Sequence, residues 1–432
     1  MGAKPRRWTL IGPTLIVAAV VLGPGSIVNA SKVGCGDGYD YLWVVPLAGG
    51  LMLAMTVAAI RFGVLSDSTI LDQVARRAGR IPAILVGGCL LIAITLFQAS
   101  NNHALLMARD GLVGDGLTTK FGVPGVLVDA ALLIGFNAMV IGLLLAQRAS
   151  LYSRIEKAMA WLVAGMLLAF LYCCLTLGPS PAELWGGLVP GRWTTGAVAE
   201  PASPVTDSST IGWMSLAALV ATTFSVAGAF YQTYQGRHKG WTDRDLPSTT
   251  RDAAVGIGAL VATTLLLVIT AAAGLHGRVD PGELDSAMAV AQQLSSMGRY
   301  ATPVFSFGVL AGALSSFVVN ALIGGVVACD AVGASTDLGG SPVRRATTVV
   351  LMIGAVVSLV ATVTGVNLIR FIVIAQSLTV FTYPVLAAVI GWAYWRCKDP
   401  VRRPIRAGIL VGVAAGFLVT VFLSIRTLSR LL

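Results

Sequence analysis

Two short runs rich in hydroxyl residues and glycine, 23–26 and 222–228, and a single amide, Gln376, interrupt long apolar stretches of this chain. Hydroxyls, amides and free backbone groups bind a solute through hydrogen bonds, but they are not acids, bases or nucleophiles at neutral pH. Such groups suit a neutral or anionic organic solute. The candidate substrate-binding residues are Gly23, Pro24, Gly25, Ser26, Thr222, Thr223, Ser225 and Gln376.

A second polar group lies within the apolar stretch 81–107. Gln98, Asn101 and Asn102 share one helix face by their i, i+3, i+4 spacing, and His103 follows them. Histidine changes charge near neutral pH, so an ionisable residue inside an apolar helix is a candidate for ion transfer. Buried amides also join neighbouring helices. Both interpretations stay open: coupling residues for a transported ion, or interhelical contacts.

Other kinds of site are not indicated by the sequence. No His, Cys or Asp cluster has metal-ligand spacing, and there is no phosphate-binding loop, HExxH or nucleophile elbow. The six cysteines form no CxxC pair and read as small core residues. We therefore expect no metal site, no cofactor and no enzymatic activity.

Composition indicates a membrane protein. Of 432 residues, 56% are hydrophobic and 12% are charged, about half the charged fraction of a soluble domain. The net charge of +10 is spread between apolar segments, which argues against a nucleic-acid surface. Apolar runs of roughly 20 residues predict eleven membrane spans. They lie near 10–32, 41–62, 81–107, 123–146, 155–177, 211–234, 253–275, 302–329, 346–366, 369–395 and 407–428.

The basic residues predict the orientation of these spans. With the N-terminus in the cytoplasm, 21 of the 30 lysines and arginines fall in or beside cytoplasmic loops. The C-terminus is then external, and we expect a multi-pass protein of the inner membrane. The stretch 66–80 is amphipathic and predicts a short helix at the cytoplasmic interface.

Two of the spans are predicted to be broken. Gly23-Pro24-Gly25 lies inside the first span and 222–228 lies inside the sixth. Unwound backbone at this depth must be buried in protein or line a cavity. Matching breaks five spans apart predict an inverted repeat with a binding site at the membrane midplane. We expect a single domain, 1–432, with repeats at about 10–177 and 211–395 and an extra helix at about 407–428.

The residues along the chain resemble the NRAMP family of divalent-metal transporters. Gly23-Pro24-Gly25-Ser26 stands in the place of the family's Asp-Pro-Gly-Asn signature, and Tyr41-Leu42-Trp43-Val44 follows it. Further similar stretches are 152–157, 275–277, 314–333, and Gln376 with Pro384. The resemblance implies an all-helical, LeuT-like fold of two inverted five-helix repeats plus an eleventh helix. It also implies secondary transport by alternating access, with a coupling proton or cation.

The departures from the family pattern fall at the implied metal site. The resemblance implies that the first-span Asp and Asn and a sixth-span Met bind the metal, whereas this chain has Gly23, Ser26 and Ser225 there. A divalent ion in a site without carboxylates loses hydration that must be replaced. We therefore expect an NRAMP-like transporter whose altered site carries a small neutral or anionic organic solute. The alternatives are a family-typical divalent metal ion (Mn²⁺, Fe²⁺ or Mg²⁺) as substrate, or a non-transporting solute sensor.

Overall fold

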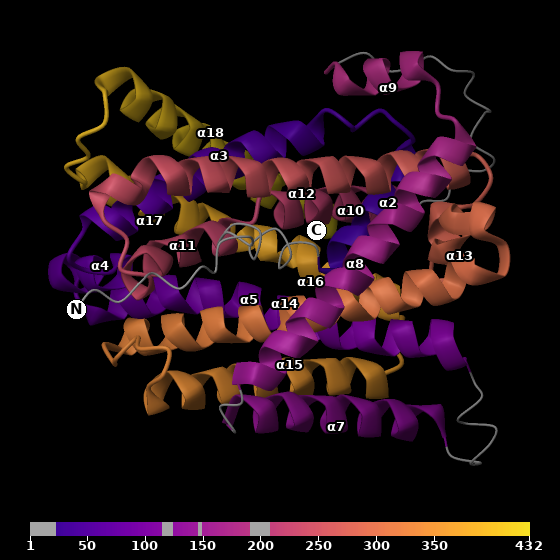
Figure 1. The fold of residues 1–432 in the computed structure, drawn as a ribbon, viewed down its shortest axis with the longest axis horizontal. Helices are drawn as coiled ribbons and strands as arrows, with labels where there is room; N and C mark the ends of the chain where they lie inside the picture. Colours follow the sequence, from indigo (N-terminus) through magenta and orange to yellow (C-terminus); the bar gives the residue numbers. More distant parts are fainter. Residues whose placement is uncertain (1–22, 115–123, 146–148, 191–207) are drawn as a thin grey trace.

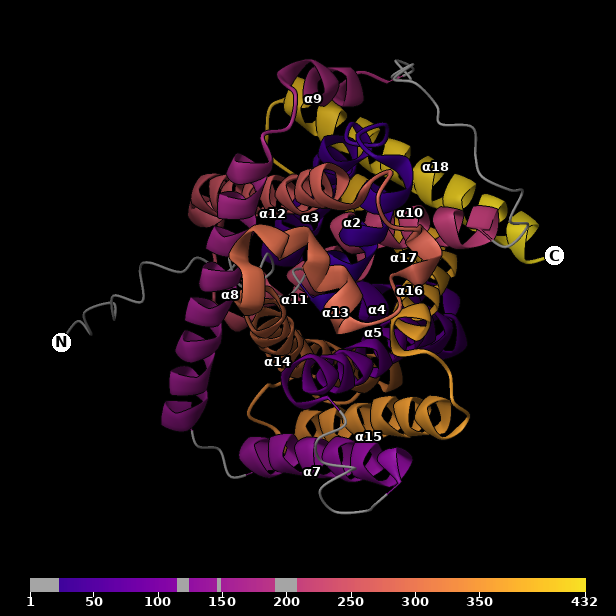
Figure 2. The ribbon, with the colours of Figure 1, turned by 90° about the vertical axis from the view of Figure 1, so that its right-hand side faces the viewer.

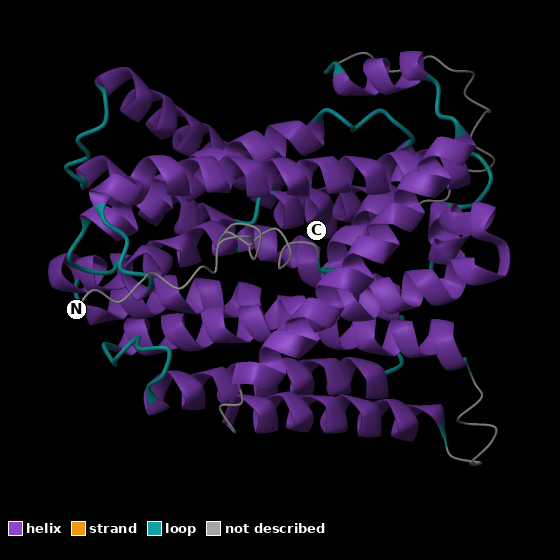
Figure 3. Cartoon of the chain, in the orientation of Figure 1, coloured by secondary structure: helices purple, strands orange, loops and turns teal. Residues whose placement is uncertain are grey.

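The computed structural model describes residues 23–114, 124–145, 149–190 and 208–432. These ranges contain α-helices and short 3-10 turns, and no strand is present among them (Figure 3). The first half of the first predicted span, 10–22, lies outside the described residues.

Long apolar helices coincide with eight of the predicted spans. Among the described residues, eight helical segments are long and apolar enough to cross a membrane, or up to ten if each of two bent pairs is one span. One of the eight segments is the interrupted pair at 212–238, and α8 belongs to a bent pair. The long helices without an interruption are α3 (Val44–Leu65), α5 (Arg80–Val113), α7 (Gly125–Leu145), α8 (Ala149–Leu177), α12 (Leu246–Leu275), α14 (Ala301–Val332), α15 (Ser341–Val363) and α18 (Arg403–Leu431).

The predicted breaks appear as helix ends. α2 (Pro24–Asp37) begins at Pro24, whose ring favours the first helical position. The sixth span is divided into α10 (Ser208–Thr223) and α11 (Val226–His238). Both breaks therefore occur where glycine, proline or hydroxyl residues weaken the helix.

The tenth predicted span, 369–395, is present but is broken, a feature that was not predicted. It is divided into α16 (Leu368–Leu378), the turn η4 (Thr379–Phe381) and α17 (Tyr383–Arg396), with a bend of 41°. Pro384 has no amide proton to donate to the preceding turn. The hydroxyls of Thr379 and Thr382 instead donate to main-chain carbonyls one turn earlier.

Short helices cover the ends of the bundle. The predicted amphipathic segment contains α4, whose first turn is capped by Thr69 accepting from the Asp72 amide. The helix α9 lies in a loop for which no helix was expected. The short elements are α4 (Ile70–Ala78), α9 (Pro181–Leu188), η1 (Asp243–Asp245), η2 (Pro281–Glu283), α13 (Ala287–Ala291) and η3 (Gln292–Tyr300).

The half-helices lie inside the bundle and continuous helices surround them. α7 and α15 pack together at one edge, and α18 lies on the opposite side (Figures 1 and 2). These outer helices expose large apolar side chains such as Leu127, Val356 and Leu418, which suits contact with lipid. In contrast, every residue of α2 from Pro24 to Cys35 is buried. The architecture thus places the broken helices around the centre of the molecule.

Candidate functional site

A cavity of about 40 Å³ lies between the ends of the broken helices. This space holds a few water molecules, since one needs roughly 10–15 Å³ by the same measure. Its walls come from α2, α5, α10, α11, α14 and α16. The polar residues that line it are Ser26, Asn101, Thr222, Ser225, Tyr231, Gln235, Ser316, Asn320 and Gln376.

Gln376 lies directly over the first turn of α2. Its Oε1 accepts from Asn29 Nδ2 at 2.8 Å, and its Nε2 donates to Ser100 Oγ at 3.0 Å. A Cβ atom added at Gly25 would lie 1.5 Å from Gln376 Nε2. Gly25 therefore has a steric role: only the absence of a side chain lets the amide reach this position.

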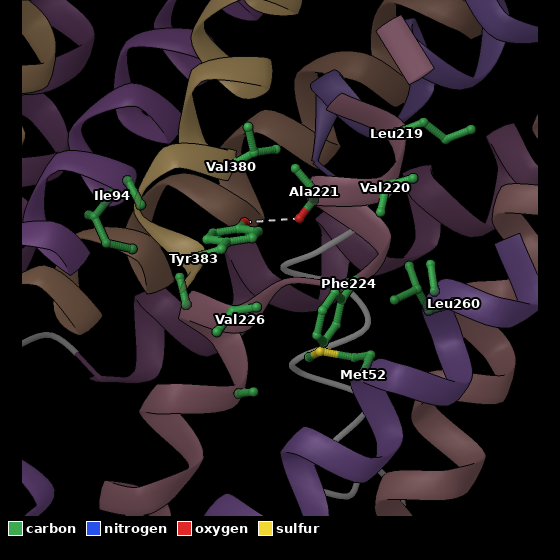
Figure 4. Close-up of a cluster of buried hydrophobic side chains, with 14 of the residues drawn as sticks. Met52, Ile94, Leu219, Val220, Ala221, Phe224, Val226, Leu260, Val380 and Tyr383 are labelled. Carbon is green, nitrogen blue, oxygen red and sulfur yellow. Dashed lines mark hydrogen bonds between the residues drawn. The ribbon is translucent and has the colours of Figure 1, made fainter. Parts of the chain in front are cut away.

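The break between α10 and α11 is held by side chains. Ser225 Oγ accepts from the Gly228 amide at 3.2 Å and so caps α11. The hydroxyls of Thr222 and Thr223 both donate to the Leu219 carbonyl. Tyr383 of α17 donates to the Ala221 carbonyl at 2.9 Å, while Phe224 points toward Met52 (Figure 4). These contacts leave Thr222 and Ser225 at the cavity surface.

Two asparagines and a serine form the wall opposite this break. Asn101 Nδ2 donates to Ser316 Oγ at 3.3 Å, and Asn320 Nδ2 donates to the same atom at 3.0 Å. Because both amide nitrogens turn toward Ser316, the carbonyl oxygens of Asn101 and Asn320 are the acceptors that these side chains can offer a ligand. Neither Asn320 nor Ser316 was among the candidates from the sequence.

The remaining third-span candidates do not line the cavity. Gln98 Nε2 donates to the Phe317 carbonyl at 2.9 Å, and Asn102 Oδ1 accepts from Asn137 at 2.8 Å, so both join neighbouring helices. His103 stacks on Phe371, and its Nδ1 lies 2.8 Å from Ser358 Oγ. The interpretation as interhelical contacts thus describes Gln98 and Asn102, and a coupling role for His103 stays a prediction.

Among the described residues that line the cavity, no side chain is charged. Within the described ranges, no group of three or more His, Cys, Asp or Glu residues could hold a metal ion. The buried carboxylates of Asp330 and Asp399 lie elsewhere, bound to Tyr234 and Arg61. Asp129 forms an ion pair with Arg109 at 2.6 Å. The central site is therefore neutral.

The cavity extends toward one end of the bundle and is covered at the other. Tyr231 and half-buried Gln235 continue its wall along α11, toward the end that carries most basic loops. At the opposite end, Ser31 of α2 exchanges hydrogen bonds with Gln293, and Lys32 Nζ donates to the Pro281 carbonyl at 2.9 Å. These contacts hold the segment between α12 and α14 against α2.

The sequence candidates divide into two groups. Gly23, Ser26, Asn101, Thr222, Ser225 and Gln376 line the cavity. Pro24, Gly25, Thr223, Gln98, Asn102 and His103 do not line it. The polar lining residues that were missing from the candidates are Tyr231, Gln235, Ser316 and Asn320. Ser316 and Asn320 could have been found, since they are polar residues one turn apart in an apolar span.

Comparison with known families gives a match over nearly the whole chain. The family described as "Natural resistance-associated macrophage protein-like" (Nramp) matches residues 14–430. This range contains every residue that lines the cavity.

Solved structures share the fold. A manganese transporter from Eremococcus coleocola, in complex with an aromatic bis-isothiourea compound, is 15% identical with a TM-score of 0.67, and the match covers 96% of this chain and 86% of that one. MhsT in complex with L-phenylalanine is 14% identical with a TM-score of 0.52, over 98% of this chain and 100% of that one. The expected LeuT-like, all-helical fold is confirmed.

Proposed function

The chain belongs to the Nramp family of transporters, and from this premise we propose that it carries a divalent metal ion through the neutral central cavity. Family membership makes it a membrane transporter and not an enzyme, and it favours transport over the solute sensor that the sequence left open. It also favours the divalent ion over the organic solute that we expected from the altered signature residues.

The oxygen-rich lining is the observation that carries this proposal. Hydroxyl and amide oxygens are hard ligands that suit Mg²⁺ and Mn²⁺ better than softer metals. Asn101 and Asn320 turn their nitrogens to Ser316, which leaves two carbonyl oxygens for a cation. A site without carboxylates cannot replace a full hydration shell, so the ion would keep several waters, for which the cavity has room.

The case for an anionic solute is weakened by the helix ends. We expected free amides near Gly25 and Gly228 to bind a carboxylate. However, the Gly228 amide donates to Ser225 Oγ, and the Ser26 amide donates to the Gly23 carbonyl at 3.0 Å. Because these donors already have acceptors, the helix termini offer fewer groups to an anion.

We propose that transport proceeds by alternating access, with the basic end of the bundle in the cytoplasm. The excess of lysine and arginine in the loops at this end supports that orientation, with the N-terminus inside, the C-terminus outside and the inner membrane as location. The cavity extends toward the same end, and the opposite end is covered. This arrangement corresponds to an inward-facing or nearly inward-facing state.

Uptake into proteoliposomes tests the proposal. We expect Mn²⁺ or Mg²⁺ to quench or excite a trapped fluorophore faster than in protein-free vesicles. Gln376→Ala should slow entry at least tenfold, because it removes a lining amide and releases Asn29 and Ser100. Thr264→Val is the control, since this buried hydroxyl on α12 has no hydrogen-bond partner and does not line the cavity. Absence of entry for both ions would contradict a metal substrate.

Asn320→Asp gives a sharper test of the charge of the substrate. A carboxylate in the cavity attracts a cation, and after its own desolvation a gain of about 1.4 kcal/mol is reasonable. The half-saturating Mn²⁺ concentration should therefore fall about tenfold. A neutral or anionic substrate would instead lose affinity in this variant.

A small neutral organic solute is the second candidate. It is favoured by one observation: in the part of the chain that the structure describes, no charged side chain lines the cavity. If neither metal ion enters the proteoliposomes, amides and neutral amino-acid derivatives are the compounds to screen next, by binding-induced thermal stabilisation of the purified protein.

A further inference from the structure

A buried carboxylate joins three elements at the basic end of the bundle. Asp330 lies in the last turn of α14 and is 5% exposed. Its Oδ1 accepts from Thr69 Oγ1 at 2.9 Å, and its Oδ2 accepts from the Tyr234 hydroxyl at 2.6 Å. One side chain therefore connects α14 to the N-cap of α4 and to α11.

The carboxylate depends on these two hydroxyls. Among the described residues, no lysine, arginine or histidine forms an ion pair with Asp330. The nearby Arg80 donates instead to the main-chain carbonyls of Asp330 and Ala331, at 3.2 and 3.5 Å. A buried carboxylate without a counter-ion needs its hydrogen-bond donors, so the contact to Tyr234 holds α11 firmly in this position.

Tyr234 belongs to α11, the helix that forms the cavity wall toward the basic end of the bundle. Ala227, Gly228, Tyr231 and Gln235 of α11 all line the cavity. At its start, α11 is connected to α10 only through the unwound residues 224–225. The link between α10 and α11 is thus not helical, and near its other end α11 is fastened by Tyr234, which is fully buried.

We propose that Asp330 is a positioning residue that latches α11 against α4 and α14, and that the Tyr234 hydrogen bond must break for the cavity to open fully at the basic end. The inference rests on the proposed function only in taking the cavity as the transport path. Asp330 does not contact the substrate, because it is not among the cavity-lining residues. Its effect is on the equilibrium between closed and open positions of α11.

Access to the cavity can be measured without knowing the substrate. Ile323 lines the cavity on α14 and serves as a reporter when it is replaced by cysteine. Labelling of the chain without this substitution, which has six cysteines, gives the background rate. The protein is placed in nanodiscs and treated with a hydrophilic maleimide. Tyr234→Phe, which removes only the hydroxyl, should raise the labelling rate of Ile323→Cys at least fivefold. Asp330→Asn should raise it as well.

Tyr394→Phe is the matched control. Tyr394 also donates from its hydroxyl to a buried aspartate, Asp399 Oδ2 at 2.7 Å, but this hydrogen bond joins α17 to the loop after it instead of joining α11 to α14. The labelling rate of Ile323→Cys should be the same with and without the Tyr394→Phe substitution. Equal rates for both tyrosine variants, whether unchanged or raised together, would overturn the latch.

A second measurement covers the case of a poorly folded variant. Spin labels at His238→Cys on α11 and Arg76→Cys on α4 report the separation of the two helices, since both native side chains are exposed. Thr69→Ser keeps the donor to Asp330 and should leave the distance distribution unchanged, whereas Tyr234→Phe should lengthen or broaden it. An unchanged distribution in Tyr234→Phe contradicts the proposal. The labelling rate and the distance distribution do not depend on the substrate, so a failure of metal uptake would leave both measurements valid.

Discussion

Asp399→Asn is expected to destabilise the protein by about 3–5 kcal/mol, the usual effect of removing one partner from a buried ion pair. Arg61 binds both oxygens of this carboxylate, with Nη2 at 2.6 Å from Oδ1. The side chain of Asp399 is completely buried and that of Arg61 is 10% exposed. The amide variant would leave the guanidinium buried without a counter-charge.

Two further hydrogen-bond donors to Asp399 increase the expected loss of stability. Tyr394 donates to Oδ2 at 2.7 Å and the Val401 amide donates to Oδ1 at 3.0 Å. Burial raises the pKa of Asp399, but the hydrogen bonds from Arg61, Tyr394 and Val401 outweigh it and hold the pKa below its ordinary value. Because the folded-state pKa is lowered, this contribution is present above about pH 4 and is lost as the pH falls through the folded-state value.

Thermal unfolding in detergent, followed by tryptophan fluorescence, measures this prediction. The midpoint should fall by about 5 °C or more at pH 7. Asp72→Asn is the control, since Asp72 pairs with Arg76 on the surface of α4, where such pairs contribute about 0–1 kcal/mol. Similar unfolding midpoints for the two variants would show that the buried Arg61–Asp399 pair adds little to the stability of the protein.

Gly25→Ala is expected to reduce transport at least tenfold while the protein still folds. The new Cβ would lie 1.5 Å from Gln376 Nε2, so the amide must leave its place between Asn29 and Ser100. The displaced end belongs to a flexible side chain, and the fold can therefore absorb the change. The cavity loses the lining group that Gln376 supplies.

Gly50→Ala is the control for the substitution itself. Nothing lies within 4 Å of a Cβ built at Gly50, and alanine stabilises an exposed helix position. The double variant Gly25→Ala/Gln376→Ala should transport no worse than Gln376→Ala alone, because both changes act through one group. Independent, additive losses would mean that Gly25 acts by another route, such as the start of α2.

The positions of most spans, and of the breaks in the first and sixth of them, could be predicted from the sequence. A membrane requires about 20 apolar residues for each helix, so the apolar runs predict α3, α5 and the other long helices directly. Proline is unfavourable inside a helix but suits its first turn, which predicts a helix that starts near Pro24. Ser26, Thr222, Ser225 and Gln376 then meet in one cavity because the broken helices lie side by side.

What the tertiary structure decided is the direction of each polar side chain and its partner. Gln98 and Asn101 are one turn apart, yet Gln98 binds the Phe317 carbonyl and Asn101 lines the cavity. Arg61 and Asp399 are 338 residues apart, and no local pattern pairs them. The reason is physical: the spacing of residues along a helix fixes its faces, but only the packed neighbours determine which face meets water, substrate or another helix.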